Sequence, residues 1–176
     1  MKKFFPLICL LLASCSSVPS LKDNMKEAQL KTMKDPTSYE LLSLDKYKDI
    51  TYGEEIQSRI DQQISRKESA ERQLDFYTNS VPNEENANKA KSDIERAEKI
   101  ISGLEELRTI KSDSLDVIAA TIYTHKFNGK NGLGVVVPNL NFAIVLPDGS
   151  VKGFAEDEKS IPRNPNDFQE YFDLLK

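Results

Sequence analysis

The fold is decided by residues 84–111, which read EENANKAKSDIERAEKIISGLEELRTIK. Apolar side chains recur there at spacings of four, three, four and three residues: Ala90, Ile94, Ala97, Ile101 and Leu104. This spacing places them along one stripe of an α-helix, as in the a and d positions of two coiled-coil heptads. Charged and polar residues fill the positions between them. The sequence therefore predicts a long helix with one narrow apolar seam that packs against a second helix.

The second helix is predicted immediately upstream, beginning near Glu54. Its apolar residues also recur at helical spacings, separated by charged residues: Ile56, Ile60, Ile64, Leu74 and Tyr77. A turn over residues 81–84 (Val-Pro-Asn-Glu) separates the two segments, and Asn86 or Asn88 is expected to cap the later helix. Each arm of about 26 residues would span about 39 Å. Residues from about 54 to 111 are thus expected to form an antiparallel, coiled-coil-like helical hairpin.

The segments on both sides of this hairpin indicate a small α+β domain. A helix is expected from Leu21 to residues 34–36 (Lys-Asp-Pro), because a proline disfavours helical geometry in the residue before it. Alternation of apolar and polar residues, with a Pro-Asp-Gly turn at 147–149, predicts five strands: 38–44, 115–123, 133–137, 142–146 and 150–154. A short helix beginning at Asn166 or Asp167 is expected to end the chain. The predicted fold is a small antiparallel sheet with terminal helices and the inserted helical hairpin.

Composition excludes several classes of protein. The chain has 176 residues, with 24 Lys and Arg against 28 Asp and Glu, and a formal net charge of −4. General nucleic-acid binders depend on neutralising phosphates, so this charge argues against that class. A hydrophobic share of 39% and a charged share of 30% exclude a protein with several membrane spans. The length fits one domain with a core of its own.

The first twenty residues predict the compartment. Lys2 and Lys3 precede a ten-residue apolar run that is too short to cross a bilayer but has the length of a signal-peptide core. Residues 12–15 (Leu-Ala-Ser-Cys) follow, and they resemble the lipobox of bacterial lipoproteins. That resemblance implies that residues 1–14 are a cleaved signal peptide, that Cys15 is acylated, and that residues 15–20 are a tether to a single domain over 21–176. An ordinary secretory signal and an uncleaved anchor are the alternatives.

Lipidation would give the protein its first partner, the lipid bilayer, through Cys15. Several acyl chains anchor a protein stably where one is marginal. Cleavage would also remove Cys9, which leaves the mature chain without a free thiol. In the lipoprotein family, Ser16 rather than Asp after the cysteine favours the outer membrane. We therefore expect the periplasmic face of the outer membrane, with the cell surface as the alternative.

Two further motifs resemble a family of small bacterial envelope domains, Bacteroidetes-like and largely of unknown function. Residues 33–38 (Met-Lys-Asp-Pro-Thr-Ser) are similar to its L-K-D-P-x-S motif, which ends a helix and leads into a strand. Asn128, Lys130, Asn131 and Gly134 match its N-x-K-N-x-x-G motif, which closes the domain in a β-hairpin. The usual short members lack a helical hairpin between the two motifs. The resemblance implies fold and location only.

Residues with catalytic chemistry are sparse, so no enzyme and no cofactor is predicted. His125 is the only imidazole, and with no second histidine a transition-metal site is not expected. Residues 129–134 fit neither a P-loop nor a dinucleotide fingerprint, so their glycines are expected to form a tight connection between strands. The carboxylate pairs are expected on solvated surfaces: Glu54 with Glu55, Glu105 with Glu106, and Asp157 with Glu158.

Two functional hypotheses from different classes remain. The first is a non-enzymatic envelope lipoprotein whose charged helical hairpin binds a protein partner or a second copy of the chain. The second is a ligand-binding module that holds a glycan or peptide with the 128–134 loop, through Asn128, Lys130, Asn131 and Gly134, helped by the nearby Tyr123 and Asn139. An enzyme with an unrecognised acid–base pair is a third and weaker hypothesis.

Overall fold

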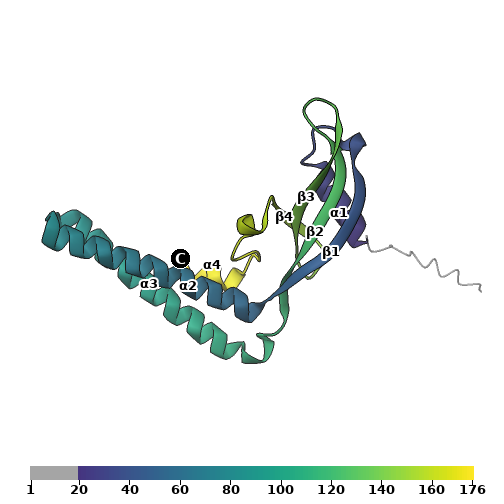
Figure 1. Cartoon of the computed structure of the whole chain (residues 1–176). Helices are drawn as coiled ribbons and strands as arrows, with labels where there is room; N and C mark the ends of the chain where they lie inside the picture. The colour runs from purple at the N-terminus through teal and green to yellow at the C-terminus, as the bar shows by residue number, and fades with distance from the viewer. Residues whose placement is uncertain (1–19) are drawn as a thin grey trace, which may run out of the picture.

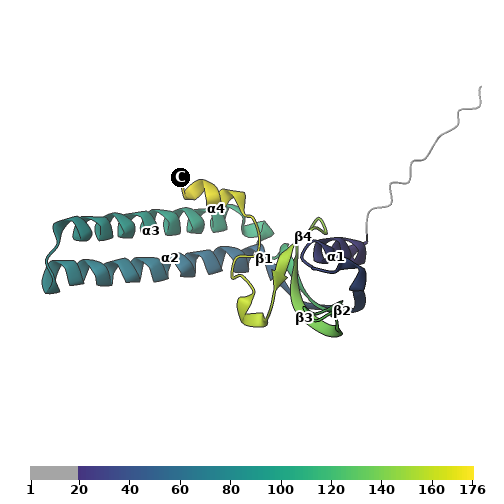
Figure 2. The same cartoon turned by 90° about the horizontal axis from the view of Figure 1, so that it is seen from above.

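A computed structural model describes residues 20–176 of the chain. Cys15, the signal peptide and most of the predicted tether lie outside the described residues. The described chain has two parts, a sheet domain and a long helical arm that projects from one end of it (Figures 1 and 2). The fold is α+β, with an antiparallel sheet and a long helical hairpin, as predicted.

The sheet has four antiparallel strands in the order β1-β2-β3-β4. Their bounds are β1 (Glu40–Thr51), β2 (Ile118–Lys130), β3 (Val136–Val145) and β4 (Val151–Ala155). The helical arm is inserted between β1 and β2, which confirms the predicted position of the insertion. The Pro-Asp-Gly turn joins β3 to β4, and Gly149 adopts the positive φ of 81° that favours glycine there.

Several strands differ from their predicted bounds. β1 runs on to Thr51 instead of ending at Leu44, because its polar second half pairs with β2 along a sheet edge. The two strands predicted over 133–146 are one continuous strand, β3, since ten residue pairs join it to β2. Pro138 is tolerated inside β3 because β4 pairs only from Phe142 onwards, which leaves Pro138 on a free edge.

One face of the sheet is covered by α1 (Leu21–Leu30). Met25 is buried against Ala143 and Val145 of β3. This helix stops earlier than predicted, because the Thr32 hydroxyl and backbone N–H both donate to the Gln29 carbonyl and so compete with the next helical turn. A short 3₁₀ turn, η1 (Pro36–Ser38), then leads into β1.

The opposite face is covered only in part. Ile50, Ile122 and Ile144 form a cluster there, against which Ile161 packs from the segment after β4. That segment contains the short 3₁₀ turn η4 (Glu158–Ser160). Strand β2 is buried on both faces around Ala119 and Ala120.

The arm consists of α2 (Tyr52–Asp75), one π-helical turn η2 (Phe76–Ser80), and α3 (Glu84–Ile110). Thr51 and Glu54 form a capping box at the start of α2. The prediction that Asn86 or Asn88 caps α3 is wrong. Asn83 is the cap, and its Oδ1 accepts a hydrogen bond from the Asn86 backbone at 3.0 Å. A 3₁₀ turn, η3 (Ser112–Ser114), then returns the chain to the sheet, so β2 begins at Ile118 rather than 115.

The predicted seam is largely confirmed in α3 and only partly in α2. Ala90, Ala97 and Leu104 are buried, but Ile100 is buried more deeply than Ile101. In α2 the prediction for Ile64 is wrong, because 41% of its surface is exposed. Gln63 is buried in its place, since the C-terminal segment covers that side of α2.

The C-terminal helix α4 (Gln169–Leu174) lies against the base of the arm (Figure 1). Phe168 and Tyr171 are buried there among four large side chains of the arm: Ile56, Ile60, Ile100 and Leu104. This cluster is the core of the arm. It fixes the chain end on the helical hairpin rather than on the sheet.

Candidate interaction surfaces

The two sequence motifs of the sheet domain contact each other. The Lys130 ammonium donates to the Asp35 carboxylate at 2.9 Å, and the Lys130 backbone N–H donates to the Ser38 hydroxyl at 2.9 Å. Asn128 donates to Glu40 at 2.9 Å. A hydrogen bond from the Thr37 hydroxyl lowers the pKa of the Asp35 carboxyl, and the Lys130 ammonium lowers it further. These residues therefore join the entrance of β1 to the end of β2.

Asn131 builds the turn between β2 and β3. Its Oδ1 accepts hydrogen bonds from the backbone of Leu133 at 2.9 Å and of Val135 at 3.1 Å. Gly134 has φ of 78°, as expected of a glycine in a tight turn. The expectation that residues 129–134 form one connection needs correction, because Gly129 lies inside β2 and has no positive φ. Met33 lies against Gly129 so closely that a Cβ atom there would be 2.9 Å from the methionine methyl carbon.

The polar groups proposed for ligand binding are engaged within the protein. Asn139 donates to the Val137 carbonyl, and Tyr123 packs against the Met25 cluster beneath α1. Asn131 is bonded within the turn, whereas Asn128 and Lys130 are bonded to Glu40 and Asp35 beside β1. The structure brings the predicted loop residues together at the end of β2 and in the turn that follows it.

The predicted strand 115–123 would place His125 just beyond a strand end, whereas the structure places it in the middle of β2. The ring is fully buried, stacks on Phe127 at 4.8 Å between centroids, and is bonded through both nitrogens. Asn141 accepts from Nδ1 at 2.9 Å, and the Tyr39 hydroxyl lies 3.1 Å from Nε2. Burial lowers the pKa of His125, opposed by its hydrogen bond to Asn141. The ring is a neutral, fully bonded part of the core.

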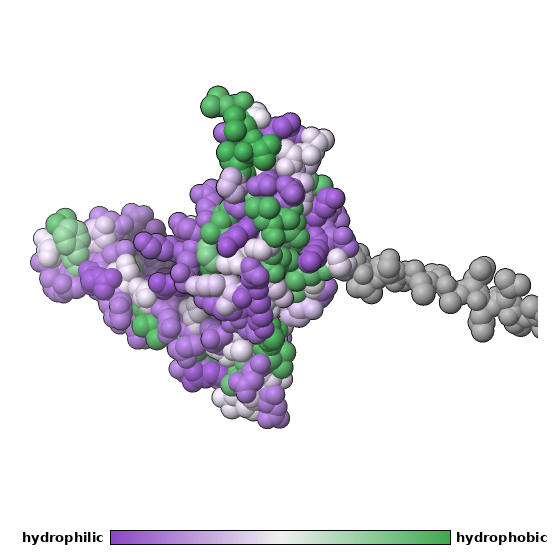
Figure 3. Space-filling view, turned by 45° about the vertical axis from the view of Figure 1, so that its right-hand side comes forward, coloured by the Kyte–Doolittle hydropathy of each residue, from purple (hydrophilic) through white to green (hydrophobic). Residues whose placement is uncertain are grey.

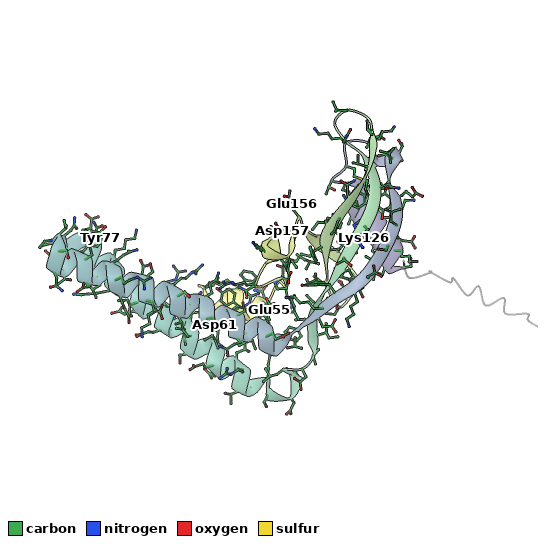
Figure 4. The ribbon with its side chains drawn as sticks, in the orientation of Figure 1. Glu55, Asp61, Tyr77, Lys126, Glu156 and Asp157 are labelled. Atoms are coloured by element: carbon green, nitrogen blue, oxygen red, sulfur yellow. The ribbon has the colours of Figure 1, made fainter. Side chains whose placement is uncertain are left out.

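An ion pair that the sequence analysis missed is buried at the base of the arm. Glu55, which lies at the base of the arm (Figure 4), was expected on a solvated surface but is buried. Its Oε1 accepts a hydrogen bond from Arg59 at 2.5 Å. Burial raises the pKa of the Glu55 carboxyl, and the Arg59 guanidinium opposes that rise. The i, i+4 spacing on one helix was the available signal, but such pairs usually lie at the surface.

Arg59 also holds the C-terminal segment. Its Nη2 donates to the Asn166 carbonyl at 2.8 Å, and its guanidinium carbon lies 4.3 Å from the centre of the Tyr171 ring. The Tyr171 hydroxyl in turn accepts from Gln63 at 3.0 Å. The buried charge is therefore stabilised by a carbonyl, a carboxylate and an aromatic face.

Beyond α4 the groove between α2 and α3 stays open. A cavity of about 400 Å³ lies there, bounded at its inner end by Leu175. Its walls are polar side chains from both helices: Gln63, Arg66, Ser69, Gln73, Asp93 and Arg96. Ala70 and Ala97 lie at its floor, and both are buried between the helices. This outer groove is the continuation of the groove between α2 and α3 in which α4 packs at the base of the arm.

No group of three or more potential metal ligands occurs within residues 20–176. Over the same residues, no helix has the length and apolar character needed to cross a membrane.

Comparison with known proteins gives no match to a family model, to a curated protein or to a solved structure. The resemblances to bacterial lipoproteins and to small envelope domains therefore stay predictions.

Proposed function

We propose that the chain is a non-enzymatic envelope lipoprotein, anchored through Cys15, whose helical arm binds a helical segment of a partner protein. The observation that carries this proposal is the outer groove between α2 and α3, which is open where α4 leaves off. A partner helix placed end to end with α4 would contact α2 and α3 on its two sides and Ala70 and Ala97 beneath it. Docking of an amphipathic helix in a groove between helices is a common mode of recognition.

The walls of the outer groove indicate the chemistry of the partner. Arg66 and Arg96 project from opposite sides, with Asp93 the acidic residue among the lining side chains. Arginine favours planar carboxylates, which it binds with two parallel hydrogen bonds. A partner helix with small or aliphatic residues on its inner face and acidic residues at its margins fits this groove best.

Position-specific photo-crosslinking in intact cells tests the arm. A photo-reactive residue at Gln73, which lines the groove, is expected to give a discrete adduct with another protein. The same residue at Glu68 is the control, because five residues of helix turn the side chain by about 140° away from Gln73. Adducts of equal yield from both positions, or none from Gln73, would contradict the proposal. An adduct of the chain with itself would replace the separate partner with a dimer.

Charge reversal refines the same experiment. Arg66→Glu is expected to lower the adduct yield at Gln73 several-fold, since it opposes an acidic partner. Arg72→Glu changes the same charge on α2 outside the groove lining and is expected to leave the yield unchanged. Equal losses in both variants would indicate a general effect of charge on the arm.

The anchor is tested separately by metabolic labelling with a palmitate analogue. The wild-type chain is expected to take up label and to sediment with membranes, and Cys15→Ala is expected to lose the label. Cys9→Ala is the matched control, because Cys9 lies in the predicted signal peptide and should not affect labelling. Labelling that survives in Cys15→Ala would rule out the proposed site.

A further inference from the structure

The hairpin of β2 and β3 ends in an exposed apolar tip, formed by Leu133, Val135 and Val136. Their exposed fractions are 88%, 55% and 54%. The tip projects beyond the rest of the sheet domain as a compact hydrophobic knob (Figure 3). Residues 131–147 contain no charged side chain. Exposed apolar surface of this kind usually marks a site of interaction.

The tip is held in shape by the domain beneath it. Asn131 fixes the backbone of Leu133 and Val135, and Lys130 is tied to Asp35 and Ser38. Leu133 is therefore presented on an ordered turn, so little conformational entropy is lost when its side chain is covered.

Basic residues lie next to the apolar tip. Lys130 projects from the end of β2, and Lys34 is exposed just before the turn into β1. The acidic neighbours are Asp35, which is paired with Lys130, and Glu40, which accepts from Asn128. An apolar knob with lysines behind it matches the interface of a bilayer, where acyl chains lie beneath anionic headgroups.

We propose that this tip inserts into the headgroup region of a bilayer that contains anionic lipid, with Leu133 as the deepest residue. Addition of a strand from a second copy is a poorer fit, because Pro138 interrupts the free edge of β3 beside the tip. The tip is thus a second membrane contact. It orients the sheet domain, and with it the helical arm, relative to the membrane.

The orientation rests on the proposed anchor at Cys15. Helix α1 runs along the sheet from Asn24, which bonds to Gly149, towards Met33, which lies against Gly129 near the tip. A ten-residue strand such as β3 is about 33 Å long, whereas six extended residues of tether reach about 20 Å. Anchor and tip can therefore meet one bilayer only if the sheet domain lies inclined along it.

The chain contains no tryptophan, so one introduced residue reports insertion directly. The mature chain from residue 15, carrying Cys15→Ser, keeps every described residue and lacks the acyl anchor. With Leu133→Trp added, vesicles of phosphatidylethanolamine and phosphatidylglycerol are expected to shift the emission to shorter wavelength. Ile110→Trp is the control, because Ile110 is 72% exposed at the C-terminal end of α3, which adjoins the opposite end of the sheet from the tip (Figure 1). No shift at residue 133, or the same shift at both positions, would overturn the proposal.

Vesicle flotation of the same unacylated chain gives the second readout. Leu133→Asp is expected to reduce the bound fraction roughly tenfold or more, because a charge replaces the deepest apolar group. Ile110→Asp is expected to leave it unchanged. Flotation that survives Leu133→Asp, or a Leu133-dependent dimer without lipid, would overturn the proposal. Because this protein carries no acyl chain, failure of the tip and failure of the Cys15 anchor are separate results.

Discussion

The base of the arm and its outer half are built from the same two helices but are held together differently. At the base, Ile60, Ile100 and Leu104 pack with Phe168 and Tyr171, which belong to the first turn of α4 and its N-cap. Further out, the residues buried between α2 and α3 are alanines: Ala70, Ala87, Ala90 and Ala97. Each methylene buried contributes about 0.8 kcal/mol, so the outer half gains far less from burial than the base does.

The difference teaches that an apolar repeat predicts helix pairing without predicting its strength. The outer half depends on helix propensity, on the Asn83 cap, and on surface pairs such as Lys67 with Glu98. Such a segment opens locally more easily than a base held by a third element. If a partner helix binds in the outer groove, as we propose, local opening of the outer half would let α2 and α3 adjust to it while the base stays packed.

Removing the buried cation should break the base most severely. Arg59→Met leaves the Glu55 carboxylate buried without its partner and is expected to lower the free energy of unfolding by about 3–5 kcal/mol. Arg66→Met, at an exposed position on the same helix, should change it by less than about 0.5 kcal/mol. Chemical denaturation followed by circular dichroism measures both. Restored stability in the double variant Glu55→Leu with Arg59→Met would attribute the loss to the unpaired charge.

Ile60 and Ile64 lie one helical turn apart on α2. Comparing them tests whether stability follows the contacts with α4 or the predicted apolar spacing. Ile60→Ala is expected to cost about 2–4 kcal/mol, because it opens a cavity in the cluster beneath α4. Ile64→Ala should cost no more than about 1 kcal/mol, since that side chain is largely exposed. Thermal or denaturant unfolding compares the pair. Equal losses would mean that the seam of α2 follows the predicted spacing after all.

Lowering the pH should change the stability contributed by His125 in the sheet and by Glu55 in the arm in opposite directions. Burial lowers the pKa of His125 below 6.5, so the unfolded chain binds this proton first and the stability from His125 is lost as pH falls through and below 6.5. Burial raises the pKa of Glu55 above 4.5, so its contribution to stability increases as pH falls towards 4.5. Each group contributes a slope of at most about 1.4 kcal/mol per pH unit.

Denaturation of His125→Gln and Glu55→Gln across this range separates the two slopes. Relative to the wild type, His125→Gln should lose less stability on acidification, and Glu55→Gln should lose more. Identical pH profiles for both variants and the wild type would contradict the assignment of either slope.

Removing the side-chain contacts of Lys130 and Asn131 beneath the tip should give the smallest change in the free energy of unfolding. Lys130→Ala removes a partly exposed ion pair to Asp35 and is expected to cost less than about 1 kcal/mol. Asn131→Ala leaves two backbone N–H groups of the turn without their acceptor, and we expect about 1 kcal/mol. Hydrogen exchange at Leu133 and Val135 should rise only in Asn131→Ala. A loss larger than that of Ile60→Ala would place this turn, rather than the arm, at the centre of stability.

Much of the fold could be predicted because its signals are local. The four-three spacing in α3, the Pro-Asp-Gly turn before β4 and the position of the helical insertion depend on residues close together in the chain. The signal peptide and the lipidation of Cys15 stay predictions, since these residues lie outside the described part of the chain. The candidate loop was also found by its motif, although its polar side chains bond to other groups of the protein.

What only the tertiary structure decided depends on residues far apart in sequence. Ile64 and Gln63 exchange places because α4, more than one hundred residues later, covers one side of α2. The same cover buries Glu55 with Arg59. Strand β2 continues past residue 123 because it pairs with β1 and β3, which places His125 inside the strand. Periodicity says which face of an element is apolar, but the burial of a given side chain depends on which distant element packs over it.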